Sequence, residues 1–260
     1  MAKIIKLYML KCGNIITPDH FLCAPFTTRE YKKLIVISIY ILEHPVHGLI
    51  LVDTGVEYST LTENELRIVG GVEPGLFKRL PEIGKSPEDV KHVLISHFHS
   101  DHCGQNSFFP NAAFHIRAKE WEAVNNPEIN SYTADDRHMA KEFAAQTPNL
   151  KLDLIPDVPE YDIFGDGSVI SIDTKGHTPG HQSFIVHFES GNEMYLTMDA
   201  THSEDELYDI RHFVNPWDMD LCVKQTGMLK DYRERTGRPL YICHDAKQWY
   251  DVKKFPDYYE

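Results

Sequence analysis

The sequence has no long apolar run, since no segment approaches about 18 consecutive apolar residues without a charge. We therefore expect no membrane-spanning helix and no membrane partner. The first residues, MAKIIKL, also lack the long apolar stretch and the small-residue cleavage site of a signal peptide. These two absences lead us to expect a cytoplasmic protein.

Cysteine is scarce as well. The five cysteines are Cys12, Cys23, Cys103, Cys222 and Cys243. Because their number is odd and no CxxC motif occurs, we expect no disulfide bonds. We interpret Cys103 and Cys243, which adjoin candidate metal ligands, as small buried apolar side chains rather than as redox groups.

Basic residues are few, because 26 Lys and Arg stand against 39 Asp and Glu and give a formal net charge of −13. A protein that binds nucleic acid usually carries a basic stripe, and the lysine pairs at 32–33 and 253–254 are too short to form one. The charge therefore argues against a nucleic-acid partner and favours a small-molecule substrate. The hydrophobic content of 42% is enough for a sizeable core.

Histidine and aspartate, in contrast, gather at the ends of apolar segments. The segment HFHSDH at 97–102 follows an apolar run, and single candidates follow other apolar runs. The candidate metal ligands are His97, His99, Asp101, His102, His177, Asp199 and His244. Imidazole and carboxylate groups suit zinc and similar divalent ions. Seven ligands are too many for one tetrahedral ion and fit two ions about 3.5–4 Å apart that share a carboxylate.

The spacing within 97–102 is compatible with two ions. In a turn at the end of a strand, residues i and i+2 can point to one side. His97 and His99 can then bind one ion, while Asp101 and His102 turn towards a second. Because the candidate ligands run from 97 to 244, a domain boundary between them would divide the site, and we expect a single domain over 1–260.

Apolar periodicity predicts a layered α/β protein. Strands are expected at 4–10, 34–43, 48–53, 93–97, 112–116, 151–155, 168–173, 183–189, 194–198 and 240–243. Helices are expected at 117–125, 133–146 and 219–235, and a further helix is expected to begin at Ser86-Pro87. The stretches 56–85 and 125–132 are the least patterned parts of this region, as functional loops often are.

The candidate ligand set, together with the sequence VDTG at 52–55, resembles the metallo-β-lactamase superfamily over nearly the whole chain. The resemblance implies an αββα sandwich with the site along one edge. It also implies that the little-patterned stretches 56–85 and 125–132 wall the substrate cleft. It implies that His97, His99 and His177 hold one ion, that Asp101, His102 and His244 hold the other, and that Asp199 bridges them. Asp53 would orient the ligands. Zinc is the expected metal, with iron, manganese and cobalt as alternatives.

Motifs outside the ligands resemble the N-acyl homoserine lactonases within that superfamily: KLYML at 6–10, HTPGHQS at 177–183, His244-Asp245, and FPDY at 255–258. This implies that a hydroxide bridging two metal ions attacks a small lactone or ester, with Asp101 carrying a proton to the leaving oxygen. Enzymes that open 4-pyridoxolactone share most of these motifs. Arylesterases, thioesterases and phosphodiesterases on the same scaffold are further alternatives, and the oligomeric state stays open.

One residue departs from the lactonase pattern. These enzymes usually carry a Tyr three residues after the bridging Asp, and here that position is His202. An imidazole can also donate a hydrogen bond, so His202 either supports the substrate carbonyl or points to solvent. We therefore take Asp101 and His202 as the candidate catalytic residues. His181 is interpreted as a structural brace, and Asp245 as a group that orients His244.

Overall fold

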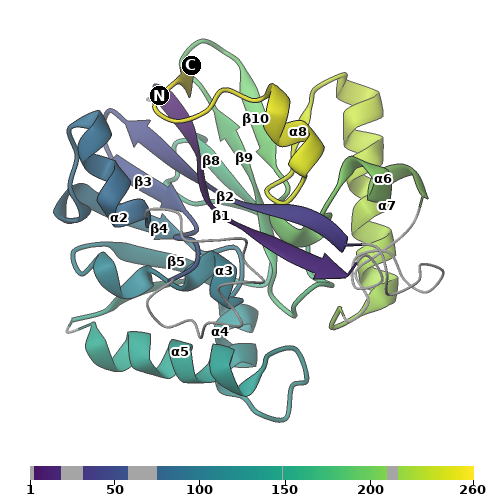
Figure 1. The fold of residues 1–260 in the computed structure, drawn as a ribbon, viewed down its shortest axis with the longest axis horizontal. Coiled ribbons are helices and arrows are strands. Elements are labelled where there is room, and N and C mark those ends of the chain that lie inside the picture. The colour runs from purple at the N-terminus through teal and green to yellow at the C-terminus, as the bar shows by residue number, and fades with distance from the viewer. Residues whose placement is uncertain (1–2, 19–31, 58–74, 148, 210–215) are drawn as a thin grey trace.

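The computed structural model describes residues 3–18, 32–57, 75–147, 149–209 and 216–260. Its strands form two sheets (Figure 1). The seven-stranded sheet has the order β12 (Tyr258–Tyr259), β1 (Lys6–Pro18), β2 (Lys32–His44), β3 (Gly48–Val52), β4 (Val90–Leu94), β5 (Ala113–Arg117) and β6 (Lys151–Ile155). The five-stranded sheet has the order β11 (Leu240–Tyr241), β10 (Glu193–Leu196), β9 (Gln182–His187), β8 (Val169–Asp173) and β7 (Glu160–Asp162).

The two sheets pack face to face because their strands carry apolar residues on both sides. In β3, Ile50 and Val52 face the second sheet, while Leu49 and Leu51 face the helices on the other side. In β10, Met194 and Leu196 face the first sheet, whereas Tyr195 faces outward. Side chains alternate along a strand, so each sheet buries both of its faces. Three apolar cores therefore separate four layers.

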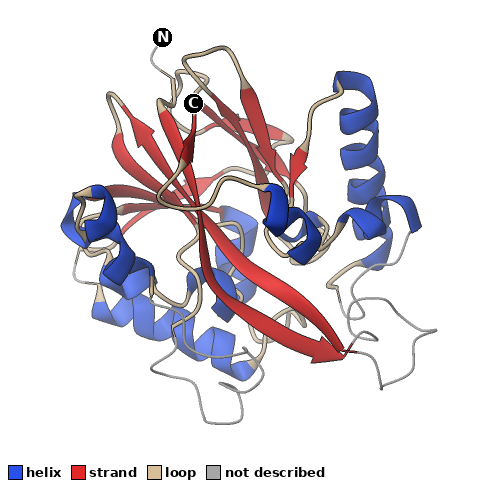
Figure 2. Ribbon diagram, turned by 45° about the horizontal axis from the view of Figure 1, so that its top comes forward, coloured by secondary structure: helices blue, strands red, loops and turns tan. Residues whose placement is uncertain are grey.

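Helices cover the two outer faces of the sandwich (Figure 2). The helices α2 (Leu76–Arg79), α4 (Ala118–Asn125) and α5 (Ala134–Gln146) contribute to the core outside the seven-stranded sheet. The helices α6 (Glu204–Asp209) and α7 (Met219–Thr236) contribute to the core outside the five-stranded sheet. The short helices α3 (Ser100–Cys103) and α8 (Ala246–Asp251) follow strands β4 and β11. The result is the αββα arrangement that the resemblance implies.

The strand and helix predictions agree with these elements in most places. All ten expected strands are present, whereas the short strands β7 and β12 were not predicted. Helix α5 is capped by Thr133, the first residue of the helix expected at 133–146, whose hydroxyl accepts from Asp136 N. Helix α7 ends at Gly237 in the left-handed conformation. The helix predicted to begin at Ser86 is wrong. Only a 3-10 turn forms at Pro87–Asp89, because β4 begins at the next residue.

Two further expectations concern the whole chain. The described cysteines, Cys12, Cys103, Cys222 and Cys243, are all free thiols and buried, whereas Cys23 lies outside the described residues. Among the helices in the described ranges, none is long and apolar enough to cross a bilayer.

Candidate metal centre

The candidate ligands lie beyond the carboxyl ends of strands in both sheets. His97 follows β4, which pairs in parallel with β3, and Asp53 comes directly after β3. Asp199 and His244 follow β10 and β11, which also pair in parallel. Parallel strands end at the same edge of a sheet, so these side chains meet at one edge of the sandwich. The structure brings all seven candidate ligands together there.

Three histidines form the first set. The distance from His97 Nε2 to His99 Nδ1 is 2.9 Å, and that from His177 Nε2 to His99 Nδ1 is 3.0 Å. The rings of His97 and His177 are buried, and burial lowers the pKa of both well below the ordinary value. Both rings are therefore neutral, which is the form of imidazole that binds a metal ion.

The second set consists of His102 and His244 with Asp101 at its margin. The two Nε2 atoms lie 3.2 Å apart, and each lies 3.2 Å from Asp199 Oδ1. Asp101 Oδ2 is farther out, at 3.7 Å from His102 Nε2 and 3.6 Å from His244 Nε2. Asp101 is the more exposed member, since 20% of its side chain is accessible against 2% for each histidine.

The protonation of the second set indicates that a cation fits there. His244 Nδ1 lies 2.7 Å from Val36 O, and His102 Nδ1 lies 2.7 Å from Asp53 Oδ2. A carbonyl and a carboxylate only accept, so both Nδ1 atoms carry a proton, and both Nε2 atoms are directed at Asp199 Oδ1, where a positive charge is favoured. Burial lowers the pKa of His102 and His244, but the charge of Asp199 outweighs it and raises both pKa values well above the ordinary one.

Asp199 lies between the two sets. Its Oδ1 faces His102 and His244, while its Oδ2 lies 3.4 Å from His177 Nε2 and 3.7 Å from His97 Nε2. Burial raises the pKa of Asp199, but the neighbouring histidines, led by His102, lower it well below the ordinary value. The carboxylate is therefore ionised, with one oxygen directed at each set.

His181 braces Asp199, as the sequence indicated. Its Nε2 accepts a hydrogen bond from the backbone N–H of Asp199 at 3.0 Å, and its Nδ1 lies 3.2 Å from Thr174 O. The ring is fully buried, and burial lowers its pKa to about 3. The neutral ring thus positions the backbone of the turn that carries Asp199.

His202 lies inside the site and does not point to solvent. Its side chain is 6% exposed, with Nε2 at 3.3 Å from Asp199 Oδ2 and Nδ1 at 3.4 Å from Glu206 Oε2. The backbone N–H of His202 also donates to Glu206 Oε2 at 2.7 Å. Burial lowers the pKa of His202, but Glu206 and Asp199 outweigh it and raise the pKa to about 10. Glu206 therefore fixes this ring, a role that its place in the sequence did not indicate.

Asp53 supports the first motif, as the resemblance implied. In addition to His102, it accepts from the backbone N–H of Ser96 at 2.8 Å and from the Ser96 hydroxyl at 2.6 Å. Asp53 is fully buried and has a positive φ of 58°, which aspartate and asparagine tolerate better than most residues. This backbone geometry aims the carboxylate at His102.

Asp245 has a different role from the one predicted. Its Oδ1 accepts from the backbone N–H groups of Lys247 and Gln248 and so caps α8. Its Oδ2 accepts from Glu204 N at 2.9 Å, which ties the start of α6 to the start of α8. His244 is oriented instead by the carbonyl group of Val36.

The predicted walls of the cleft are partly described. Residues 58–74, the larger part of the stretch 56–85, lie outside the described residues. The stretch 125–132 does reach the site, because the ring of Tyr132 lies 5.3 Å from that of His99 between centroids, at 67°. The Tyr132 hydroxyl also contacts the buried carboxyl group of Glu120.

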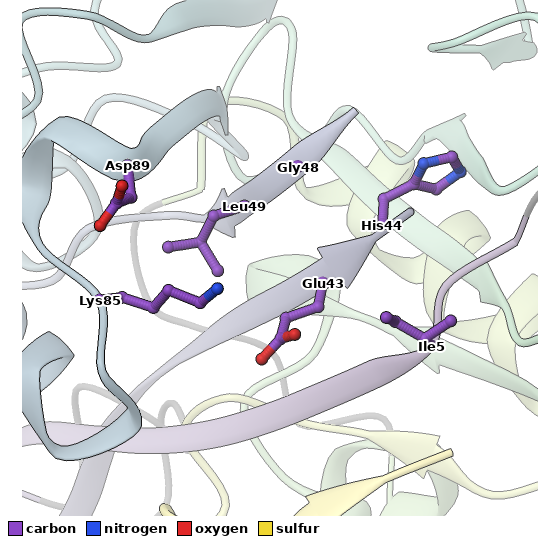
Figure 3. Close-up of a pocket in the computed structure, with 7 residues that line it drawn as sticks. All are labelled: Ile5, Glu43, His44, Gly48, Leu49, Lys85 and Asp89. Carbon is purple, nitrogen blue, oxygen red and sulfur yellow. The ribbon is translucent and has the colours of Figure 1, made fainter. Parts of the chain in front are cut away.

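A second histidine cluster does not fit a metal ion. His44 Nδ1 accepts from the backbone N–H groups of Val46 at 3.1 Å and His47 at 3.0 Å, so the ring proton is on Nε2, which faces Asp166 Oδ2 at 3.2 Å. A nitrogen that carries a proton cannot bind a cation. His44 also lines an open cavity of about 190 Å³ near the β2–β3 turn (Figure 3). That turn is at the opposite end of β3 from Asp53.

Known proteins with similar sequences match almost end to end. The N-acyl homoserine lactonase AttM of Azorhizobium caulinodans is 30% identical over 271 residues, which cover 98% of this chain and 99% of that protein. The N-acyl homoserine lactonase AiiA of Bacillus thuringiensis subsp. kurstaki is 26% identical, with 97% and 98% covered. A solved N-acyl homoserine lactone hydrolase, with N-hexanoyl-L-homoserine bound at its catalytic metal center, has a TM-score of 0.79 at 25% identity and covers 99% of this chain and 100% of its own.

The family profile gives the same result. Residues 34–235, which include six of the seven candidate ligands, match the Metallo-beta-lactamase superfamily. His244 lies just beyond the matched range, in the part that the full-length relatives also cover. The two facing sheets with helices outside them agree with this assignment, and the predicted fold class is confirmed. The chain belongs to the metallo-beta-lactamase superfamily.

Proposed function

We propose that this protein is a metal-dependent hydrolase that opens the lactone ring of N-acyl homoserine lactones. The full-length relatives bear the name of that activity, and the chain shares their superfamily. The observation that carries the proposal is the position of Asp199. Its two oxygens face two separate sets of histidine nitrogens, an arrangement suited to a carboxylate that bridges two cations.

The proposed ligand sets follow this geometry. His97, His99 and His177 would hold one divalent ion, Asp101, His102 and His244 would hold the other, and Asp199 would contribute an oxygen to each. Zinc is the proposed metal because histidine and carboxylate ligands suit it, with iron, manganese and cobalt as alternatives. When bound, the two ions supply Lewis acidity that polarises a carbonyl oxygen and lowers the pKa of water. The single domain over 1–260 and the cytoplasmic location stay predictions.

Two side chains would act on the substrate. Asp101 is the most exposed residue of the second set, so its carboxylate could carry a proton to the leaving oxygen of the opened ring. His202 Nε2 faces a carboxylate oxygen of Asp199, which only accepts, so this nitrogen is a donor. In the proposed mechanism this N–H turns from Asp199 to the carbonyl oxygen of the lactone when substrate binds. Glu206 holds the ring in place through Nδ1 and the backbone.

Substitution of His202 tests its role. His202→Ala should lower kcat for lactones by about 100-fold or more, the usual effect of removing one donor to a developing oxyanion. His202→Tyr should retain much of the activity, because a phenol also donates a hydrogen bond. His138→Ala, at an exposed position on α5, is the control. An unchanged rate for His202→Ala on every lactone that the wild type accepts would remove His202 from the mechanism.

A substrate screen tests the function as a whole. The metal-loaded protein would be offered short- and long-chain N-acyl homoserine lactones, 4-pyridoxolactone, an aryl ester, a thioester and a phosphodiester. Proton release with the acyl homoserine lactones supports the proposal. Turnover of 4-pyridoxolactone alone would keep the reaction and change the substrate, whereas turnover of the phosphodiester alone would overturn the proposal. Prior removal of metal with a chelator should abolish the activity, and added zinc, manganese, cobalt or iron should restore it.

A further inference from the structure

Glu120 is a fully buried carboxyl group on α4 that the proposed reaction does not use. It shares the buried face of α4 with Ala123 and Val124, three and four residues further along. A charged residue in this position costs free energy unless its oxygens accept hydrogen bonds. Burial raises the pKa of Glu120 to about 8, against the effect of those hydrogen bonds. The groups that donate hydrogen bonds to this carboxyl group should therefore indicate its role.

One partner belongs to the loop that carries the first two ligands. The backbone N–H of Phe98 donates to Glu120 Oε1 at 3.2 Å, and Phe98 lies between His97 and His99. The hydroxyl of Tyr132, which is 3.1 Å from the same N–H group, also donates to Glu120. Glu120 thus fixes the backbone between two histidines of the first set.

The other partners belong to the loop that carries His177. The hydroxyl of Thr178 donates to the two oxygens of Glu120 at 3.0 and 2.9 Å, and the backbone N–H of Gly180 donates to Oε2 at 2.8 Å. Thr178 is the residue directly after His177. One carboxyl group therefore joins two loops that are about 80 residues apart in the sequence and that both supply histidines to the first ligand set.

Gly180 gives independent support for this close contact. A Cβ atom at position 180 would lie 2.7 Å from Glu120 Cβ and 2.8 Å from Glu120 Cα. Cβ atoms do not approach other atoms so closely, so a side chain here would push the loop away from α4. The loop that carries His177 is thus placed against Glu120 by its hydrogen bonds and by the absence of a side chain.

We propose that Glu120 is a positioning residue that joins the loop of His97 and His99 to the loop of His177 and so sets the spacing of the three nitrogens in the first set. The inference rests on the proposed metal centre and extends it. Groups that orient metal ligands typically contribute about 10–100-fold to metal affinity. A purely structural role for Glu120 would stabilise the fold without any effect on the affinity for metal.

Glu120→Gln is the main test, because glutamine has nearly the same size and only one acceptor oxygen. Phe98 N–H donates to one oxygen and Gly180 N–H to the other, so the amide NH₂ of glutamine must face one of these two donors. One loop then loses its acceptor. Glu122→Gln is the matched control, since Glu122 is exposed on the same helix and pairs only with Lys119 among the described residues.

The measurement is cobalt(II) binding to chelator-treated protein. The dissociation constant of each equivalent is obtained by competition with a chromophoric chelator, and the visible absorption of bound cobalt reports the coordination geometry. Glu120→Gln should weaken the binding of one of the two cobalt equivalents by about 10–100-fold and alter the visible spectrum of that cobalt ion. Gly180→Ala should do the same without any change of charge. Glu122→Gln should bind both equivalents as the wild type does.

The outcomes separate this inference from the proposed function. If the wild type binds two equivalents and Glu120→Gln binds both with unchanged affinity and spectrum, the positioning role is wrong, even if the variant unfolds at a lower temperature. If the wild type binds fewer than two equivalents, the proposed dinuclear centre itself fails. If Glu120→Gln does not fold, Gly180→Ala and Thr178→Val decide the question, because both leave the carboxyl group in place.

Discussion

Replacement of Asp53 by asparagine tests whether the tautomer of His102 is set by its neighbour. Asp53 accepts three hydrogen bonds, from the backbone and hydroxyl of Ser96 at 2.8 and 2.6 Å and from His102 Nδ1 at 2.7 Å. Asparagine has nearly the same shape and tolerates the positive φ of 58° at this position. The change therefore alters the hydrogen bonding while it leaves the backbone in place.

Each orientation of the new amide group has a cost. If its oxygen replaces Oδ2, the NH₂ group faces the backbone N–H of Ser96, and two donors meet. If its oxygen replaces Oδ1, the NH₂ group faces His102 Nδ1, and the ring proton must move to Nε2. A protonated Nε2 cannot bind the metal ion proposed for the second set. In both cases one hydrogen bond to a charged group is lost, which is worth about 1.5–3 kcal/mol.

That loss corresponds to a decrease of roughly 10–100-fold in metal affinity, because each 1.4 kcal/mol is a factor of about ten. The assay is competition between the metal-free variant and a chromophoric chelator at fixed pH. Asp153→Asn is the control, since Asp153 also contacts a histidine, His115, but lies outside the site and has an exposed side chain. Metal affinities of Asp53→Asn that match those of Asp153→Asn would refute the tautomer argument.

Two further predictions concern stability. Burial, with the charges of His115 and His47, lowers the pKa of His92 from 6.5 to about 4, so the fold disfavours its protonated form. The free energy of unfolding should therefore fall as the pH falls from about 6.5 towards 4, and urea titrations should show a smaller fall for His92→Gln than for His138→Gln. Phe184→Ala, in the core between the sheets, should cost about 3–5 kcal/mol, whereas Leu154→Ala at an exposed position should cost far less in the same assay.

The parts of the site that the sequence predicts are those encoded by local patterns. An apolar run followed by histidine or aspartate identifies a strand and the residue beyond its end, which is why His97, Asp199 and His244 could be placed at strand ends. The common edge followed only from the resemblance to the superfamily. Strands β1 and β2 are longer than the strands expected at 4–10 and 34–43, because the two strands pair with each other beyond those ranges. The residue pattern of one strand does not show how far it pairs with another.

The supporting residues are harder to predict because their partners are distant in the sequence. Glu120 contacts Thr178 and Gly180, which are 58 and 60 residues further along. One signal was present, since Glu120 shares a helical spacing with the apolar residues Ala123 and Val124 and so faces the core. Glu206 lies four residues after His202, a spacing that brings side chains together on a helix. His202 precedes α6, so only the structure shows that the two side chains meet.

The two proposed ions would also join the two sheets. His97, His99 and His102 follow a strand of the seven-stranded sheet, whereas His177, Asp199 and His244 belong to the five-stranded sheet and its connections. Each proposed ion therefore has ligands from both layers. The sheets already share hydrogen bonds at this edge, because Gln182 donates to Ile95 O and His244 to Val36 O. Because both layers supply ligands, metal binding should stabilise the packing of one sheet on the other. Binding to the folded state alone adds about 4 kcal/mol per site to the free energy of unfolding when the free metal concentration is a thousand times Kd.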